Sequence, residues 1–181
     1  MFRFKLILPL LFIIILSATH ISVKTSASAH SPEPFNSMKP ASLCTQGERV
    51  LWSCETAKER KLASLCASKD LDKTRGYLQY RFGRSGQVEM EFPRERVNTQ
   101  TAFKYSRYTR PLVTHLKLEF VNDGFTYTIS DDSNSEEKPS RRDAAVTVTP
   151  SGANAKETTL RCRLPVTGSL MKLEDIVQRE D

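Results

Sequence analysis

The sequence predicts an all-β protein, a small antiparallel β-barrel or β-sandwich of about eight strands that is stapled by disulfide bonds. Three observations support this fold class. Short runs of alternating apolar and polar residues are separated by turn residues, which is typical of antiparallel strands. Four cysteines follow a segment with the features of an export signal. Only the C-terminal residues show the spacing of an amphipathic helix.

Residues 1–29 have the pattern of a secretory signal peptide. Arg3 and Lys5 precede the apolar run Leu6–Leu16, and small residues at 27–29 provide a cleavage site before His30. The apolar run is shorter than the about 20 residues that span a bilayer. We therefore expect no integral membrane segment after cleavage, and a periplasmic or secreted protein. Residues 30–42 contain three prolines and predict a flexible mature N-terminus.

The cysteines predict two disulfides. An even number in an exported chain favours this use, and the four are Cys44, Cys54, Cys66 and Cys162. A metal site is the alternative, but no Cys-x-x-Cys pair occurs and histidine is scarce. Three pairings are open, and the sequence does not choose among them. No metal and no cofactor are predicted.

The net charge argues against nucleic acid as a partner. The chain carries 27 basic and 21 acidic residues, and three of the basic ones lie in the predicted leader. The mature chain therefore has 24 basic against 21 acidic residues, a net charge of +3. This excess is too small to indicate nucleic-acid binding.

Residues 76–93 predict the first hairpin. Leu78, Tyr80 and Phe82 alternate with polar residues, and so do three apolar residues of the returning strand. A loop over 84–86, ending in glycine, joins the two strands. On the face toward water, Arg81 then opposes Glu89. The predicted register pairs Phe82 with Val88, Tyr80 with Met90 and Leu78 with Phe92.

A second hairpin is predicted around Asp123-Gly124, the dipeptide that best fits a two-residue hairpin turn. The polar run 131–143 that follows contains no apolar residue and predicts a mobile loop. The predicted register pairs Asn122 with Phe125, Phe120 with Tyr127, Leu118 with Ile129, Glu119 with Thr128, Lys117 with Ser130 and His115 with Asp132.

The remaining elements are shorter. Strands are predicted over 50–54, which carries the only tryptophan, and over 145–149 and 157–164. In the last strand Leu160, Cys162 and Leu164 point inward. The β-domain thus covers 43–165, and 166–181 form a C-terminal tail. This tail contains a short amphipathic helix with Ser169 as N-cap and with Leu170, Leu173, Ile176 and Val177 along one side.

Two stretches are candidate binding surfaces. The segment 102–110 is basic and aromatic, and Lys104, Tyr105, Arg107, Tyr108 and Arg110 could stack on and neutralise an acidic glycan or a single-stranded nucleic acid. An ordinary strand with a solvated basic face is the favoured interpretation. The second candidate is the turn that contains Ser151, Gly152 and Asn154.

No catalytic residue is predicted. His115 opposite Asp132 resembles the base and its orienting carboxylate in a hydrolytic triad. A surface pair without catalytic function is favoured, because no Gly-x-Ser-x-Gly motif is present and the cysteines are predicted to be oxidised. Glu89 and Glu91 lie two apart on one strand and are interpreted as a solvated face rather than as a glycosidase pair.

Three motifs resemble a family of small exported bacterial proteins of uncharacterised function: CxxGExVxxSC at 44–54, SLCAS at 64–68 and GYLQYRFG at 76–83. The resemblance covers 44–164 and implies a bacterial exported protein without assigning an activity. The general plan also looks like that of the periplasmic lysozyme inhibitors, small disulfide-containing β-barrels with a Ser-Gly-x-x-Tyr loop. Here Ser151-Gly152 is followed by Ala155 where that loop has tyrosine.

These observations favour an exported, non-enzymatic binding module of the bacterial envelope, with an unknown protein or cell-wall ligand. The alternatives are an inhibitor of, or immunity protein against, a wall-degrading enzyme such as lysozyme, acting through the loop at 151–154 or at 84–86, and a hydrolase centred on His115.

Overall fold

The computed structural model describes residues 41–152 and 156–180, so the predicted signal peptide and most of the predicted flexible N-terminus lie outside it. In the described residues, nine antiparallel strands form one sheet, which confirms the all-β prediction with one strand more than the expected eight. The sheet order is β4-β3-β2-β1-β9-β8-β7-β6-β5. The strands are β1 Arg49–Thr56, β2 Leu62–Ala67, β3 Leu78–Arg84, β4 Gln87–Phe92, β5 Lys104–Arg110, β6 Val113–Asn122, β7 Phe125–Asn134, β8 Arg141–Pro150 and β9 Thr158–Gly168.

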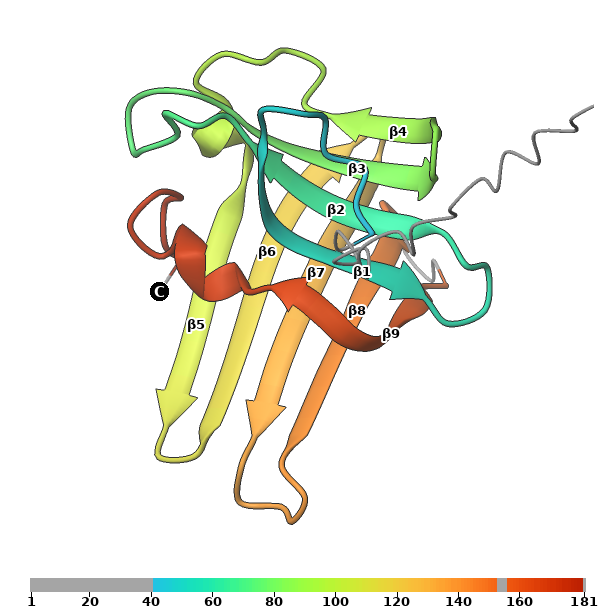
Figure 1. The fold of residues 1–181 in the computed structure, drawn as a ribbon, viewed down its shortest axis with the longest axis vertical. Coiled ribbons are helices and arrows are strands. Elements are labelled where there is room, and N and C mark those ends of the chain that lie inside the picture. The colour runs from blue at the N-terminus through green and yellow to red at the C-terminus, as the bar shows by residue number, and fades with distance from the viewer. Residues whose placement is uncertain (1–40, 153–155, 181) are drawn as a thin grey trace, which may run out of the picture. The chain divides into compact units, whose positions relative to one another are not determined.

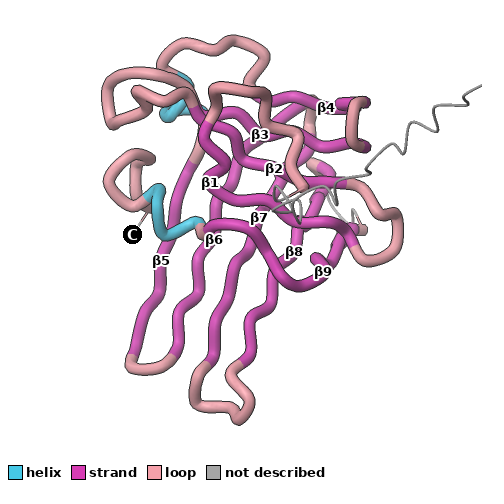
Figure 2. The backbone as a smooth tube through the Cα atoms, viewed as in Figure 1, coloured by secondary structure: helices cyan, strands magenta, loops and turns pink. Residues whose placement is uncertain are grey.

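The sheet curls into a half-barrel. Figure 1 shows β1–β4 crossing in front of β5–β8, with β9 belonging to both layers. The first part of β9 pairs with β8, and the last part pairs with β1. Helix is limited to two single 3₁₀ turns in the described part of the chain, η1 Thr99–Ala102 and η2 Leu170–Leu173 (Figure 2). No helix in this part is long and apolar enough to cross a membrane.

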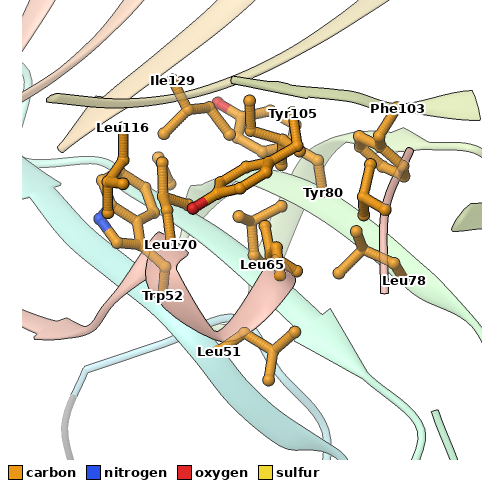
Figure 3. Packing of buried hydrophobic residues seen from close by; sticks show 14 of the residues in the cluster. Leu51, Trp52, Leu65, Leu78, Tyr80, Phe103, Tyr105, Leu116, Ile129 and Leu170 are labelled. Atoms are coloured by element: carbon orange, nitrogen blue, oxygen red, sulfur yellow. The ribbon is translucent and has the colours of Figure 1, made fainter. Parts of the chain in front are cut away.

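The core fills the space between the two layers. Trp52, Leu65 and Tyr80 from the front layer meet Tyr105 and Ile129 from the back layer (Figure 3). At one end of the core, aromatic rings bring β4 next to β6. The Phe92 ring stacks on that of Phe120 with centroids 4.5 Å apart. Side chains, rather than backbone pairing, therefore hold β4 against the back layer.

The first hairpin differs from the predicted register. The structure pairs Tyr80 with Phe92, Phe82 with Met90 and Gly83 with Val88. The predicted pairing is therefore wrong by two residues. Tyr80, Phe82, Met90 and Phe92 still pack against the core because strand faces repeat every two residues, but Val88 is 42% exposed. The physical reason is a tight two-residue turn at 85–86 combined with a β-bulge next to Gly83.

Gly83 makes the bulge possible, because its backbone adopts a φ of 153° and a side chain there has no room. A Cβ atom would lie 2.3 Å from the Gln87 carbonyl oxygen. We expect Gly83→Ala to lower the free energy of unfolding by about 2 kcal/mol or more in urea titrations. Gly86→Ala is the matched control. A Cβ atom at Gly86 would have no atom within 4 Å, so this substitution should cost only the backbone strain of its positive φ, about 1 kcal/mol. Equal losses for the two variants would contradict this account.

The second hairpin confirms its predicted register at all six pairs. Asp123 and Gly124 both have positive φ, 48° and 78°, as the expected turn type requires. The predicted loop over 131–143 is wrong in extent: β7 continues to Asn134 and β8 starts at Arg141, so only 135–140 form a loop. The polar run can form strands because Asp131 is buried and accepts two hydrogen bonds of 2.8 Å from Arg142.

The C-terminal residues are part of the core. Ser169 caps the turn η2 as predicted, accepting a hydrogen bond of 3.1 Å from the Met171 amide, but a single 3₁₀ turn replaces the expected helix. Leu170, Leu173 and Val177 are buried under the sheet. Leu164, predicted to point inward, is 58% exposed. This prediction is wrong because an irregularity in the pairing of β9 with β1 interrupts the alternation there.

Both predicted disulfides are present. Cys44 pairs with Cys66 and Cys54 with Cys162, and no described cysteine is free. The first bond attaches residues 41–48, here called the strap, to β2. The second joins β1 to β9. Two disulfides are typical of proteins from an oxidising, exported environment.

The strap covers the second face of β1–β3, which the alternation pattern assigned to solvent. Arg81 is 1% exposed there, so its predicted exposed pairing with Glu89 is wrong. Its guanidinium donates to both carboxylate oxygens of Glu48, at 2.6 and 2.8 Å, and to Glu91 at 2.9 Å. It also donates to the Leu43 carbonyl at 3.0 Å. The strap is thus held to the sheet by a buried ion pair as well as by the disulfide.

Glu48 makes this pair sensitive to pH. Burial acts to raise the pKa of Glu48, but hydrogen bonds from Arg81, Tyr77 and Thr45 outweigh it and lower the pKa from 4.5 to about 2. A carboxyl whose pKa is lower in the folded state stabilises the fold above its ordinary pKa. We expect this stabilisation to be lost as the pH falls from about 4.5 toward 2. Over this pH range, the free energy of unfolding measured in urea should fall more steeply for the native chain than for Glu48→Gln. Parallel curves of this free energy against pH would contradict the assignment.

Candidate functional site

The basic aromatic strand β5 is mostly engaged in contacts within the protein. Tyr105 is fully buried, so it cannot contact a ligand. Lys104 lies 2.5 Å from a carboxylate oxygen of Glu180. The remaining basic residues also form ion pairs, Arg107 with Glu174 and Arg110 with Glu136. Of the five predicted contact residues of this strand, Tyr108 is the one with a free, exposed side chain.

Tyr108 starts a row of side chains across three neighbouring strands. It pairs with His115 on β6, which pairs with Asp132 on β7. The Tyr108 and His115 rings stack, with centroids 5.9 Å apart and planes inclined by 27°. His115 Nδ1 lies 3.1 Å from Asp132 Oδ1, but the contact lacks hydrogen-bond geometry, and this buried oxygen has no hydrogen-bond partner among the described residues. Because Tyr108 is 58% exposed, the stack presents one aromatic face to solvent.

An open groove of about 480 Å³ surrounds this stack, here called the Tyr108 groove. Two cations in it, Lys117 and Arg179, form no ion pair with any residue of the described chain. These two cations outnumber Asp132, the one lining carboxylate that has no Lys or Arg partner in the described part of the chain, so the groove is suited to a ligand with negative charge and a flat face. The lining residues are Ser106, Arg107, Tyr108, His115, Lys117, Asp132, Arg179 and Glu180.

Sequence reasoning placed one of these two cations beside His115 and missed the other. Lys117 lies two residues from His115 on the same strand face, so the predicted hairpin already placed it beside the histidine. Arg179 comes from the C-terminal tail. It reaches the groove because residues 178–180 run along β5, with Tyr105 donating its amide to the Gln178 carbonyl at 3.1 Å. No local sequence pattern predicts that the tail pairs with β5.

The second predicted surface is far from the first. Ser151 and Gly152 are exposed, and the Ser151 amide donates to the Gly124 carbonyl at 2.8 Å. Gly124 and His115 are separated by nearly the whole of β6, about 30 Å at 3.3 Å per residue. The structure therefore does not combine this loop with β5 into one site. Asn154 lies outside the described residues.

His115 and Asp132 form the pair that a hydrolase at this place would need. A third group is also nearby, since Ser106 lines the same groove. No hydrogen bond joins Ser106 to His115 within the described ranges, and their strand positions are diagonal rather than opposite. In the described residues the arrangement therefore lacks the hydrogen bond between nucleophile and base that a hydrolytic triad uses.

The family-resemblance motifs gather at the strap. Glu48 from the first motif binds Arg81 from the third. Ser53 from the first and Ser64 from the second share a hydrogen bond of 2.8 Å. The Cys44–Cys66 bond joins the same two motifs. These residues build the fold and lie outside the Tyr108 groove.

Comparison with known proteins identifies no relative, because no protein-family model, curated protein or solved structure matches this chain.

Proposed function

We propose that this chain is an exported, non-enzymatic binding module of the bacterial envelope that holds its ligand in the Tyr108 groove. The observation that carries the proposal is the exposed Tyr108–His115 stack beside the two unpaired cations Lys117 and Arg179. An aromatic face stacks on flat rings, and Arg and Lys bind carboxylate or phosphate groups. The ligand class that fits is an anionic cell-wall polymer or an acidic segment of an envelope protein.

The rigidity of the scaffold supports this function. Six of the eight lining residues lie on the three paired strands β5, β6 and β7, and the other two, Arg179 and Glu180, lie in the segment that pairs with β5. A site whose side chains are already in place loses little conformational freedom on binding, which favours affinity.

A pull-down with the oxidised chain from residue 30 tests the proposal. The bait would be immobilised and exposed to an envelope extract, and to purified anionic and neutral wall polymers in parallel. A stoichiometric protein partner or a saturable anionic polymer would support a binding module. If that partner were a wall-degrading enzyme, the module would be an inhibitor or immunity protein. Turnover of a substrate by the pure protein would overturn the proposal.

Two substitutions assign the binding to the groove. We expect Tyr108→Ala and Lys117→Ala each to weaken binding about tenfold, because each removes one contact worth about 1.4 kcal/mol. Both side chains are exposed, so the thermal midpoint should stay unchanged. Lys58→Ala is the matched control, since it removes an exposed cation from the β1–β2 turn. Equal affinity for Tyr108→Ala, Lys117→Ala and the control would remove the groove from the proposal.

A further inference from the structure

One edge of the half-barrel is open. β4 is the terminal strand of the sheet, and no backbone hydrogen bond reaches it from any described segment other than β3. The opposite edge, β5, is treated differently. Residues 178–180 lie along it and exchange two hydrogen bonds with Tyr105, of 3.1 and 2.8 Å. An unpaired strand edge is a template onto which another extended chain can pair.

A groove of about 450 Å³ runs along this open edge. It is bounded on one side by β4 and the residues that follow it, and on the other by the β6–β7 turn at Asn122 and Asp123. The groove therefore lies between β4 and the back layer, where the sheet does not close into a full barrel. An added strand would occupy this gap.

The side chains of β4 alternate in a way that specifies a partner. Met90 and Phe92 are partly buried and pack against the core. Glu89 and Glu91 lie on the other face, toward Lys61 and Arg81. A strand added beside β4 would place alternate side chains next to these two sets. Apolar residues would fit beside Met90 and Phe92, and basic residues beside the glutamates.

The charge of the groove favours the same partner. Its lining holds four carboxylates, Glu89, Glu91, Glu95 and Asp123, against one cation, Arg94. Glu89 is already paired with Lys61, and Glu91 with Arg81 and Arg96. Glu95 and Asp123 form no ion pair with any side chain of residues 41–152 and 156–180. A second copy of this chain pairing through its own β4 would oppose carboxylates to carboxylates. That arrangement is destabilising, so the edge is matched to a different, basic chain.

We propose that β4 accepts an extended segment of another protein, with alternating apolar and basic residues, as a tenth strand of the sheet. Strand addition of this kind gives affinity through backbone hydrogen bonds and specificity through the alternating side chains. The interaction goes beyond the proposed function and uses a different surface, because none of its residues lines the Tyr108 groove.

The test uses the oxidised chain and a labelled heptapeptide, Val-Lys-Val-Lys-Val-Lys-Val, with fluorescence anisotropy as the readout. Two further versions carry N-methyl groups on the valines or on the lysines, which removes the backbone donors of one edge. A Val-Glu peptide of the same length controls for charge. We expect saturable binding of the Val-Lys peptide, a loss of at least about tenfold for one N-methylated version, and no binding of the Val-Glu peptide. Hydrogen exchange should show new protection of backbone amides in β4.

Variants locate the peptide. Replacing Glu95 by glutamine and Asp123 by asparagine together should weaken binding about fivefold or more, because the two exposed groove carboxylates that form no ion pair within the described chain are removed. Glu157→Gln is the control, an exposed carboxylate on the approach to β9. Tyr108→Ala should leave peptide binding unchanged, which separates this inference from the proposed function. No binding at about 1 mM peptide, or equal binding of both N-methylated versions, would overturn the proposal.

Discussion

Replacing Arg81 by methionine is expected to lower the free energy of unfolding by about 3–5 kcal/mol. Glu48 is buried beside it, with a side chain 3% exposed, and would lose the cation that compensates its charge. The strap would also lose the hydrogen bond from Arg81 to the Leu43 carbonyl. For a domain with a total stability of about 5–15 kcal/mol, a loss of this size is readily measured by urea unfolding.

Two controls make the result specific. Arg96→Met removes an exposed cation that also pairs with Glu91, at 3.4 Å, and should cost less than about 1 kcal/mol. The double variant Arg81→Met with Glu48→Met removes both charges and should be more stable than Arg81→Met alone. A double variant that is as unstable as the single one would show that packing, rather than the uncompensated carboxylate, causes the loss.

Removing the Cys54–Cys162 disulfide is expected to have the second large effect. The two cysteines are 108 residues apart. In the chain-entropy model, a cross-link of that span lowers the entropy of the unfolded chain and thereby stabilises the fold by about 4.8 kcal/mol. The Cys44–Cys66 bond spans 22 residues, and the same model gives a stabilisation of about 3.4 kcal/mol. The variant Cys54→Ala with Cys162→Ala should therefore be less stable than Cys44→Ala with Cys66→Ala.

Urea unfolding of the two double variants checks this order. Both variants keep the other disulfide, so each is a control for the other. If the Cys44 and Cys66 variant lost more stability, attachment of the strap would outweigh the restriction of the unfolded chain.

The sequence predicts those parts of the fold that local patterns specify. The second hairpin follows from its Asp-Gly turn and its strict alternation, and all six predicted pairs are present. In the first hairpin the faces follow from alternation as well. The register does not, because a three-residue loop and a two-residue turn with a bulge both place Tyr80, Phe82, Met90 and Phe92 on the core side.

Other features depend on contacts between distant segments, which local patterns do not contain. Arg81 alternates with apolar residues as an exposed side chain would, yet the strap buries it. Tyr105 belongs to a basic aromatic stretch that suggests a binding surface, but its side chain is buried in the core. In the candidate site, Tyr108 and the His115–Asp132 pair could be predicted from the strand pattern. Arg179 could not, because it reaches the site only through the pairing of the C-terminal tail with β5.

The position of β9 has a consequence for how the protein is made. It is the last strand of the described residues and the central strand of the sheet, with β1–β4 on one side and β5–β8 on the other. Each group of four pairs mainly with its own sequence neighbours and can form as the chain emerges, N-terminus first. The two groups are joined only when β9 enters between β1 and β8. A nascent chain that stops before Thr158 thus carries two separate sheets with open edges, and these join only after β9 has been synthesised.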